Sequence, residues 1–191
     1  MVPRVNAALG LLDGFTHVAW IADDNRFSTR GWDEKVLSAL EQCPIVFCND
    51  AVSPGAKPSH VFMDARIPQA LGWFLLPGVH STFFDDAWQT LGTGMDATTG
   101  PLFPGVVPAD EWAIARFDGL GIGYLPQVRI SHLYIEKDNA DWFAKDHETY
   151  RHWLRHAAED DIGKARRALR PGRDARRSAA TALAGAQSGA C

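Results

Sequence analysis

The pattern of apolar and polar positions along this chain predicts an alternation of strands and helices. Residues 16–22 are nearly all apolar or β-branched, which is typical of a buried strand, and they run directly into Asp23 and Asp24. The same strand pattern appears in three further stretches, residues 44–49, 60–65 and 121–134. Strands that alternate with helices indicate an α/β fold.

Helical spacing marks most of the segments between these strands. Residues 32–40 have apolar side chains three and four positions apart, and Thr29 is expected to cap this helix after a polar loop. Other helices are expected over residues 5–12, 67–71, 83–88, 110–117 and 141–158, the last with Trp142, Phe143, Tyr150, Trp153 and Leu154 facing inward.

Charge divides the chain near residue 160. Residues 1–160 hold 12 basic and 21 acidic residues, a net charge of −9, whereas residues 161–191 hold 7 and 2, a net charge of +5. An acidic body repels phosphate backbones, so we expect no nucleic acid to bind it, and surplus carboxylates suit divalent cations. We expect one domain over residues 1–160 and a basic Ala/Arg-rich tail over residues 161–191, which begins as a frayed helix and continues disordered, because it has almost no large apolar side chains.

The cellular context follows from what the sequence lacks. No run of about 18 apolar residues occurs and no secretory leader opens the chain, which predicts a cytoplasmic protein without a membrane span. Cys43, Cys48 and Cys191 have no metal-site spacing and are expected to be reduced thiols.

Asp23 and Asp24 form the first candidate site. Two adjacent carboxylates on a turn can offer oxygen ligands to Mg²⁺ or Mn²⁺. They also follow a strand, and open α/β sheets bind ligands at the carboxyl ends of their strands. A turn that merely faces solvent is the alternative interpretation.

The sequence around this pair resembles a known enzyme family. Residues 21–33, Ile-Ala-Asp-Asp-Asn-Arg-Phe-Ser-Thr-Arg-Gly-Trp-Asp, are similar to the metal-binding region of GT-A fold glycosyltransferases of the family-2-like type, in the branch written roughly G-D-D-H-x-x-x-T-x-G-W-D. Further pieces follow in that branch's order: Asn49-Asp50, residues 70–74, His80 with Phe84-Asp85-Asp86-x-Trp88, and residues 128–132 with Lys137. The resemblance implies an incomplete GT-A, Rossmann-like mixed sheet flanked by helices.

The resemblance also implies an activity, the transfer of a hexosyl group from a nucleotide-sugar donor to an unidentified acceptor. Among nucleotide sugars, a UDP-sugar is the donor that we expect first. Asp23 is then the direct ligand of a Mn²⁺ or Mg²⁺ ion, Asp24 is a second ligand or orients the first, and His132 supplies a nitrogen ligand or contacts the diphosphate. Trp32 and Asp33 belong to the donor site. The ion neutralises the charge that develops on the departing diphosphate.

On the acceptor side, the resemblance assigns the catalytic base to Asp85 and Asp86. In an inverting transfer, a carboxylate takes the proton of the attacking hydroxyl. Asp86 matches the Glu-Asp form of the family's acidic pair and is slightly preferred, while Asp85 matches its Asp-Asn form. An acidic N-terminal turn of a helix explains both residues without catalysis. Trp32 and Trp88 are expected to fill the core rather than stack on a sugar.

The chain departs from the family in two places. Tyr134 stands where the family has the second histidine of an H-x-H ending, and only about 20 residues precede Asp23, where the family has the strand–helix–strand unit that holds the nucleoside. We therefore expect apolar sheet edges that a protein partner or oligomer covers. Two other functions stay open: a non-catalytic remnant or partner-dependent subunit with the same fold, and a metal-dependent phosphohydrolase that uses Asp23, Asp24 and His132.

Overall fold

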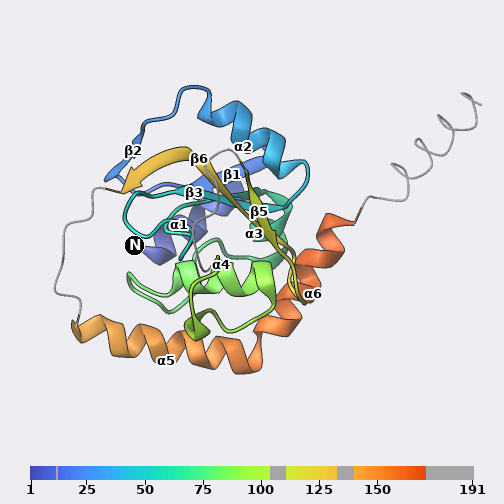
Figure 1. The fold of residues 1–191 in the computed structure, drawn as a ribbon. Helices are drawn as coiled ribbons and strands as arrows, with labels where there is room; N and C mark the ends of the chain where they lie inside the picture. The colour runs from blue at the N-terminus through green and yellow to red at the C-terminus, as the bar shows by residue number, and fades with distance from the viewer. Residues whose placement is uncertain (12, 104–110, 133–139, 171–191) are drawn as a thin grey trace, which may run out of the picture.

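The computed structural model describes residues 1–11, 13–103, 111–132 and 140–170, without the side chains of residues 132, 140 and 141. A mixed six-stranded sheet lies at its centre, with helices on both faces (Figure 1), which confirms the expected α/β class. The strands are β1 (His17–Trp20), β2 (Asn25–Phe27), β3 (Ile45–Asn49), β4 (Val61–Asp64), β5 (Ala113–Ala115) and β6 (Ile122–His132). The α-helices are α1 (Val2–Ala7), α2 (Trp32–Leu40), α3 (Arg66–Leu71), α4 (Phe84–Thr93), α5 (Ala140–His156) and α6 (Ala158–Leu169), and η1 (Ala8–Leu11) and η2 (Ala97–Thr99) are short 3-10 helices.

The long strand β6 organises the sheet, whose order is β1-β4-β3-β6-β2. One edge of β6 pairs in parallel with β3, and the neighbours β3–β4 and β4–β1 are antiparallel. The other edge of β6 pairs with β5 along its first residues and with β2 along its last, so that Asn25 lies opposite His132. Because β3 and β6 are parallel, their carboxyl ends meet at the same edge of the sheet.

Alternate side chains of the strands enter two separate cores. In β3, Ile45 and Phe47 join the larger cluster with α1, α3, α4, α5 and α6, whereas Val46 and Cys48 join the smaller cluster under α2. This alternation follows from the period of two in an extended strand. The described residues therefore form three layers, and α2 is the one helix among them on its face of the sheet.

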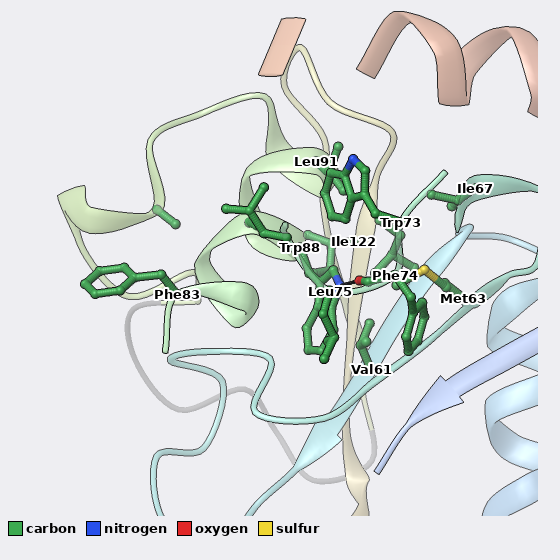
Figure 2. Close-up of a cluster of buried hydrophobic side chains, with 14 of the residues drawn as sticks. Val61, Met63, Ile67, Trp73, Phe74, Leu75, Phe83, Trp88, Leu91 and Ile122 are labelled. Carbon is green, nitrogen blue, oxygen red and sulfur yellow. Dashed lines mark hydrogen bonds between the residues drawn. The ribbon is translucent and has the colours of Figure 1, made fainter. Parts of the chain in front are cut away.

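The larger core is built around Trp88 of α4 (Figure 2). Trp88 is fully buried and its indole Nε1 donates a hydrogen bond of 2.9 Å to the carbonyl oxygen of Phe74. This confirms the expected core role of Trp88. Trp32 is half-buried in the smaller core, where its ring packs against Phe27 at 4.3 Å and Phe62 at 5.7 Å between centroids.

Two short strands correct the sequence-based expectations. Residues 25–27 were expected to be loop and form β2, and Ala113–Ala115 form β5 inside a stretch that was expected to be helical. Both strands take their hydrogen bonds from the free edge of β6, so a distant partner decides their conformation. Residue 110, where the expected helix begins, lies outside the described residues.

The helices also differ from expectation at their ends. Thr29 does not cap α2, because Gly31 holds the N-cap position and the Thr29 hydroxyl bonds to the backbone of β6 instead. Trp142 and Phe143 are 46% and 54% exposed rather than inward, whereas Tyr150 and Trp153 are buried as expected.

The expected boundary at residue 160 falls inside α6. Ile162 and Ala165 of this helix are buried, and α6 packs against α3, so residues 161–169 are part of the folded body rather than of a tail. The buried small residues of α6 are alanines, Ala158 and Ala165, which leave room for close packing and explain how a stretch with few large apolar residues still packs. The rest of the expected tail, residues 171–191, lies outside the described residues.

Two expectations about context can be compared with the described part of the chain. None of its helices combines the length and the apolar character that crossing a bilayer requires. Cys43 and Cys48 are buried free thiols, as expected.

A pair of helix glycines tests how closely α4 approaches the sheet. A Cβ atom on Gly92 would lie 2.5 Å from the Ile122 Cβ atom of β6, so Gly92→Ala must push the helix and the strand apart. We expect Gly92→Ala to lower the free energy of unfolding by about 1–3 kcal/mol. The matched change Gly163→Ala in α6 meets only the flexible end of Arg167 at 3.4 Å and should raise it by about 0.5–1 kcal/mol. Urea denaturation measures both, and equal effects would contradict the close packing.

Candidate functional site

Asp23 and Asp24 lie at the tip of a tight turn between β1 and β2. The backbone N–H of Asn25 donates to the carbonyl oxygen of Ala22 at 3.1 Å, and the Ala22 N–H donates to the Asn25 side-chain oxygen at 2.8 Å. Asp23 is exposed and Asp24 is half-buried. Asn25 thus closes the turn on both sides, and Asp23 and Asp24 lie between its hydrogen-bonded ends.

The turn lies beside the carboxyl end of β6, because the turn leads into β2 and the first residue of β2 pairs with the last residue of β6. Asn25 pairs with His132, and the Thr29 hydroxyl accepts a 2.8 Å hydrogen bond from the Arg129 N–H, which fixes the chain beyond β2 to the same strand. Asp24 is therefore the residue next to the backbone partner of His132. Trp32 and Asp33 follow in the first turn of α2, with Asp33 exposed.

Oxygen ligands from this turn fit a hard divalent cation such as Mg²⁺ or Mn²⁺. The described side chains contain no group of three or more His, Cys, Asp or Glu residues around a common point. The side chain of His132 is outside the described atoms, as is residue 134. The described part of this candidate metal site therefore consists of the Asp23 and Asp24 carboxylates and the backbone of His132.

Asp85 and Asp86 occupy the first turn of α4, and a lysine that the sequence analysis did not single out joins them. Lys57 lies in the loop that leaves the carboxyl end of β3, and its Nζ donates a 2.7 Å hydrogen bond to an Asp86 oxygen. Asp86 is 2% exposed and Asp85 is half-buried. The Asp86 backbone N–H donates to the Asp85 carboxylate at 3.0 Å.

Burial and mutual repulsion perturb this pair. Burial and, after it, the negative charge of Asp86 raise the pKa of Asp85, the positive charge of Lys57 acts in the opposite direction, and the net result is a pKa of about 7. Burial alone would lower the pKa of Lys57, but the two carboxylates outweigh it and the pKa of Lys57 is raised. Asp85 can therefore exchange a proton near neutral pH while Lys57 stays charged.

The loop that carries Lys57 is shaped by Asp50, which directly follows β3. One Asp50 oxygen accepts hydrogen bonds from the Val52 and Ser53 N–H groups at 3.0 and 2.8 Å, and the other accepts one from the Ser59 hydroxyl at 3.0 Å. Asp50 is 4% exposed. Its carboxylate ties both ends of the loop together, so the position of Lys57 is set from the carboxyl end of β3.

Asp146 of α5 holds the segment that enters α4. This carboxylate has no exposed surface and accepts five hydrogen bonds of 2.8–3.0 Å, from the backbone N–H groups of His80, Ser81 and Thr82, the Thr82 hydroxyl and the His80 ring. Burial alone would raise the pKa of Asp146, but these donors hold it below its usual range. These hydrogen bonds, which we call the Asp146 clamp, fix residues 80–82, which only two residues separate from the acidic pair.

Phe83 connects the clamp to α4 in a left-handed backbone conformation, with φ of 63°. Its ring is buried against Phe143, His147 and Tyr150 of α5, at 5.0, 5.1 and 5.7 Å between centroids. The amino ends of α4 and α5 therefore lie together, on the left of the view in Figure 1, where the carboxyl end of β6 also lies.

The structure thus forms two acidic groups rather than one. Asp23 and Asp24 gather with the backbone of His132, while Asp85 and Asp86 gather with Lys57. Asp146 and Lys57 are the two residues that the sequence analysis missed. For Asp146 a signal existed, because it lies four positions before Tyr150, and a carboxylate on that apolar helix face requires hydrogen-bond donors.

Comparison with known proteins adds no family to this description. No protein-family model matches the chain, and neither a curated protein nor a solved structure matches it.

Removing the charge of Asp146 should loosen the entry to α4. Asp146→Asn leaves one acceptor oxygen and turns the other into an amide that faces N–H donors, so we expect the free energy of unfolding at pH 7 to fall by about 1.5–3 kcal/mol. The lowered pKa of Asp146 contributes stability above the ordinary aspartate pKa of about 4, and this contribution is lost as pH falls toward the lowered value. The difference between wild type and Asp146→Asn in urea denaturation should therefore shrink below about pH 4; a constant difference would argue against the clamp.

Proposed function

We propose that this chain is a metal-dependent glycosyltransferase of the GT-A type, which transfers a hexosyl group from a nucleotide sugar to an acceptor hydroxyl. The observation that carries the proposal is the relation of the two acidic groups to the parallel pair β3–β6. The Asp23–Asp24 turn is paired to the carboxyl end of β6, and the loop that brings Lys57 to Asp86 leaves the carboxyl end of β3. Ligand sites of open α/β sheets lie at this edge.

On the donor side, Asp23 and Asp24 would hold Mn²⁺ or Mg²⁺, together with His132. When bound, such an ion supplies positive charge against a diphosphate. The two carboxylates would hold the ion at the sheet edge, because the Asn25 hydrogen bonds fix the backbone of their turn. Trp32 and Asp33, in the first turn of α2, are the donor-site residues of the proposal.

On the acceptor side, Asp85 is the better base of the pair, in contrast to the slight preference for Asp86 from the sequence. The Asp86 carboxylate is neutralised by Lys57, whereas the pKa of Asp85 is raised to about 7, close to the pH at which a general base works best. As the acceptor oxygen attacks the sugar carbon, its proton passes to an Asp85 oxygen and the bond to the nucleotide diphosphate breaks. Asp86 and Lys57 hold Asp85 in place and set its basicity.

A metal-dependent assay with UDP-sugars separates the candidate functions. Glycosyl transfer that requires both an acceptor and Mn²⁺ supports the proposal. Phosphate release or diphosphate cleavage without acceptor identifies the phosphohydrolase, and no turnover with bound nucleotide sugar identifies the remnant or the partner-dependent subunit.

Asp23→Ala tests the donor side. Asp23 is exposed at a turn tip, so we expect the variant to fold normally, as circular dichroism would show, and to lose Mn²⁺-dependent activity. Asp160→Ala removes an equally exposed carboxylate from α6 and should keep full activity. Full turnover in Asp23→Ala would discard the metal assignment.

The pH dependence of transfer tests the acceptor side. Because Asp85 must be ionised to accept a proton, kcat/KM should rise with pH through about 7. Lys57→Met removes the charge that lowers the pKa of Asp85, so the midpoint should move to higher pH. Arg66→Met removes an ion pair of the same 2.7 Å length to Asp64 and should leave the midpoint unchanged. A midpoint that stays at the same pH in Lys57→Met would remove Asp85 from the proposal.

A further inference from the structure

We infer that the acceptor carries a flat aromatic group, which binds in a pocket beside Asp85 and Asp86; this inference rests on the proposed role of that pair. The pocket has a volume of about 470 Å³ and lies between α5, η2, the loop that carries Lys57 and the residue before α4. Its walls include Lys57, Phe83, Ala97, Pro101, Phe143 and His147. A volume of this size accommodates an aryl glycoside.

Rings dominate one wall of this pocket. Phe83 lies 5.0 Å from Phe143 and 5.1 Å from His147, and the rings of Phe143 and His147 are nearly parallel, at 16° and 6.5 Å between centroids. Phe143 is 54% exposed although it is a large apolar residue. Aromatic groups pack on one another with centroids 4.5–7 Å apart, so a further ring can join this set and cover Phe143.

The walls are fixed before any ligand arrives. The Tyr150 hydroxyl bonds to the Thr90 hydroxyl of α4 at 2.8 Å and accepts a hydrogen bond of 3.1 Å from the Ala97 N–H of η2. Tyr150 itself belongs to α5, so one buried hydroxyl joins α5, α4 and η2 at the pocket. A preformed pocket loses little conformational freedom on binding, which favours affinity for a rigid ring.

One polar residue connects the pocket with the acidic pair. Lys57 lines the pocket and also donates a 2.7 Å hydrogen bond to Asp86, so Asp86 lies one residue behind this wall of the pocket. The side chains of Phe83 and Phe143 have no hydrogen-bonding groups, so hydroxyl groups at the edge of a sugar ring would lose hydrogen bonds if they were buried against them, which costs binding free energy. An aromatic group avoids that cost and leaves an attached hydroxyl for the Asp85 side.

Two glucosides that differ only in the group on the anomeric oxygen test this inference. Binding of 4-nitrophenyl β-D-glucoside and of methyl β-D-glucoside to the full chain is measured by ligand-observed NMR, without donor or metal. We expect the aryl glucoside to bind and the methyl glucoside to bind at least about tenfold more weakly. Equal binding of the two, or binding of neither, would overturn the inference.

Variants of neighbouring aromatic residues locate the binding site. Phe143→Ala should weaken aryl binding about three- to tenfold, the value of one aromatic pair. Trp142→Ala is the matched control, because Trp142 is the adjacent exposed aromatic of α5 and stacks on His80 outside the pocket. His147→Ala changes the same wall independently and should also weaken binding. Unchanged aryl binding in both wall variants would place the ring elsewhere.

The result separates this inference from the proposed function. Aryl binding that depends on Phe143, in a protein without transferase activity, keeps the aromatic site and discards the transferase. Transfer to methyl and aryl glucosides with the same KM keeps the transferase and discards the aromatic site.

Discussion

The buried carboxylate of Asp146 is the interaction on which the geometry of the acidic pair depends. It satisfies three consecutive backbone N–H groups in the segment that precedes α4. Because Asp146 belongs to α5, the same hydrogen bonds join this helix to a segment that lies 64–66 positions earlier in the chain. The direction in which α4 presents Asp85 and Asp86 is thus set by a residue that has no part in the proposed chemistry.

A second constraint comes from β6, which has three partner strands on two edges. Its parallel pairing with β3 brings two strand ends together, and its antiparallel pairing with β2 adds the Asp23–Asp24 turn at the same end. α4 in turn lies close to β6 because Gly92 has no side chain to hold it away from Ile122. The sheet and the helix entry therefore act as one frame for both acidic groups.

Local patterns were sufficient for some elements and insufficient for others. Residues 32–40 and 45–49 were predictable because their own apolar spacing and their flanking glycine and proline residues agree with the final structure. β2 and β5 were not, because three-residue strands acquire their conformation from β6. For the site, adjacent carboxylates stand out in a sequence, but Lys57 pairs with Asp86 across 29 positions and Asp146 reaches His80 across 66. Only the folded chain brings such partners together.

The left-handed backbone of Phe83 carries a consequence for how this region can vary. A non-glycine residue in this conformation is disfavoured by roughly 1–2 kcal/mol, and a glycine would remove that penalty. Glycine would also delete the ring that meets Phe143, His147 and Tyr150. Relief of local strain and preservation of the aromatic wall therefore require different residues at the same position. The chain has the residue that preserves the wall, and its backbone remains strained there.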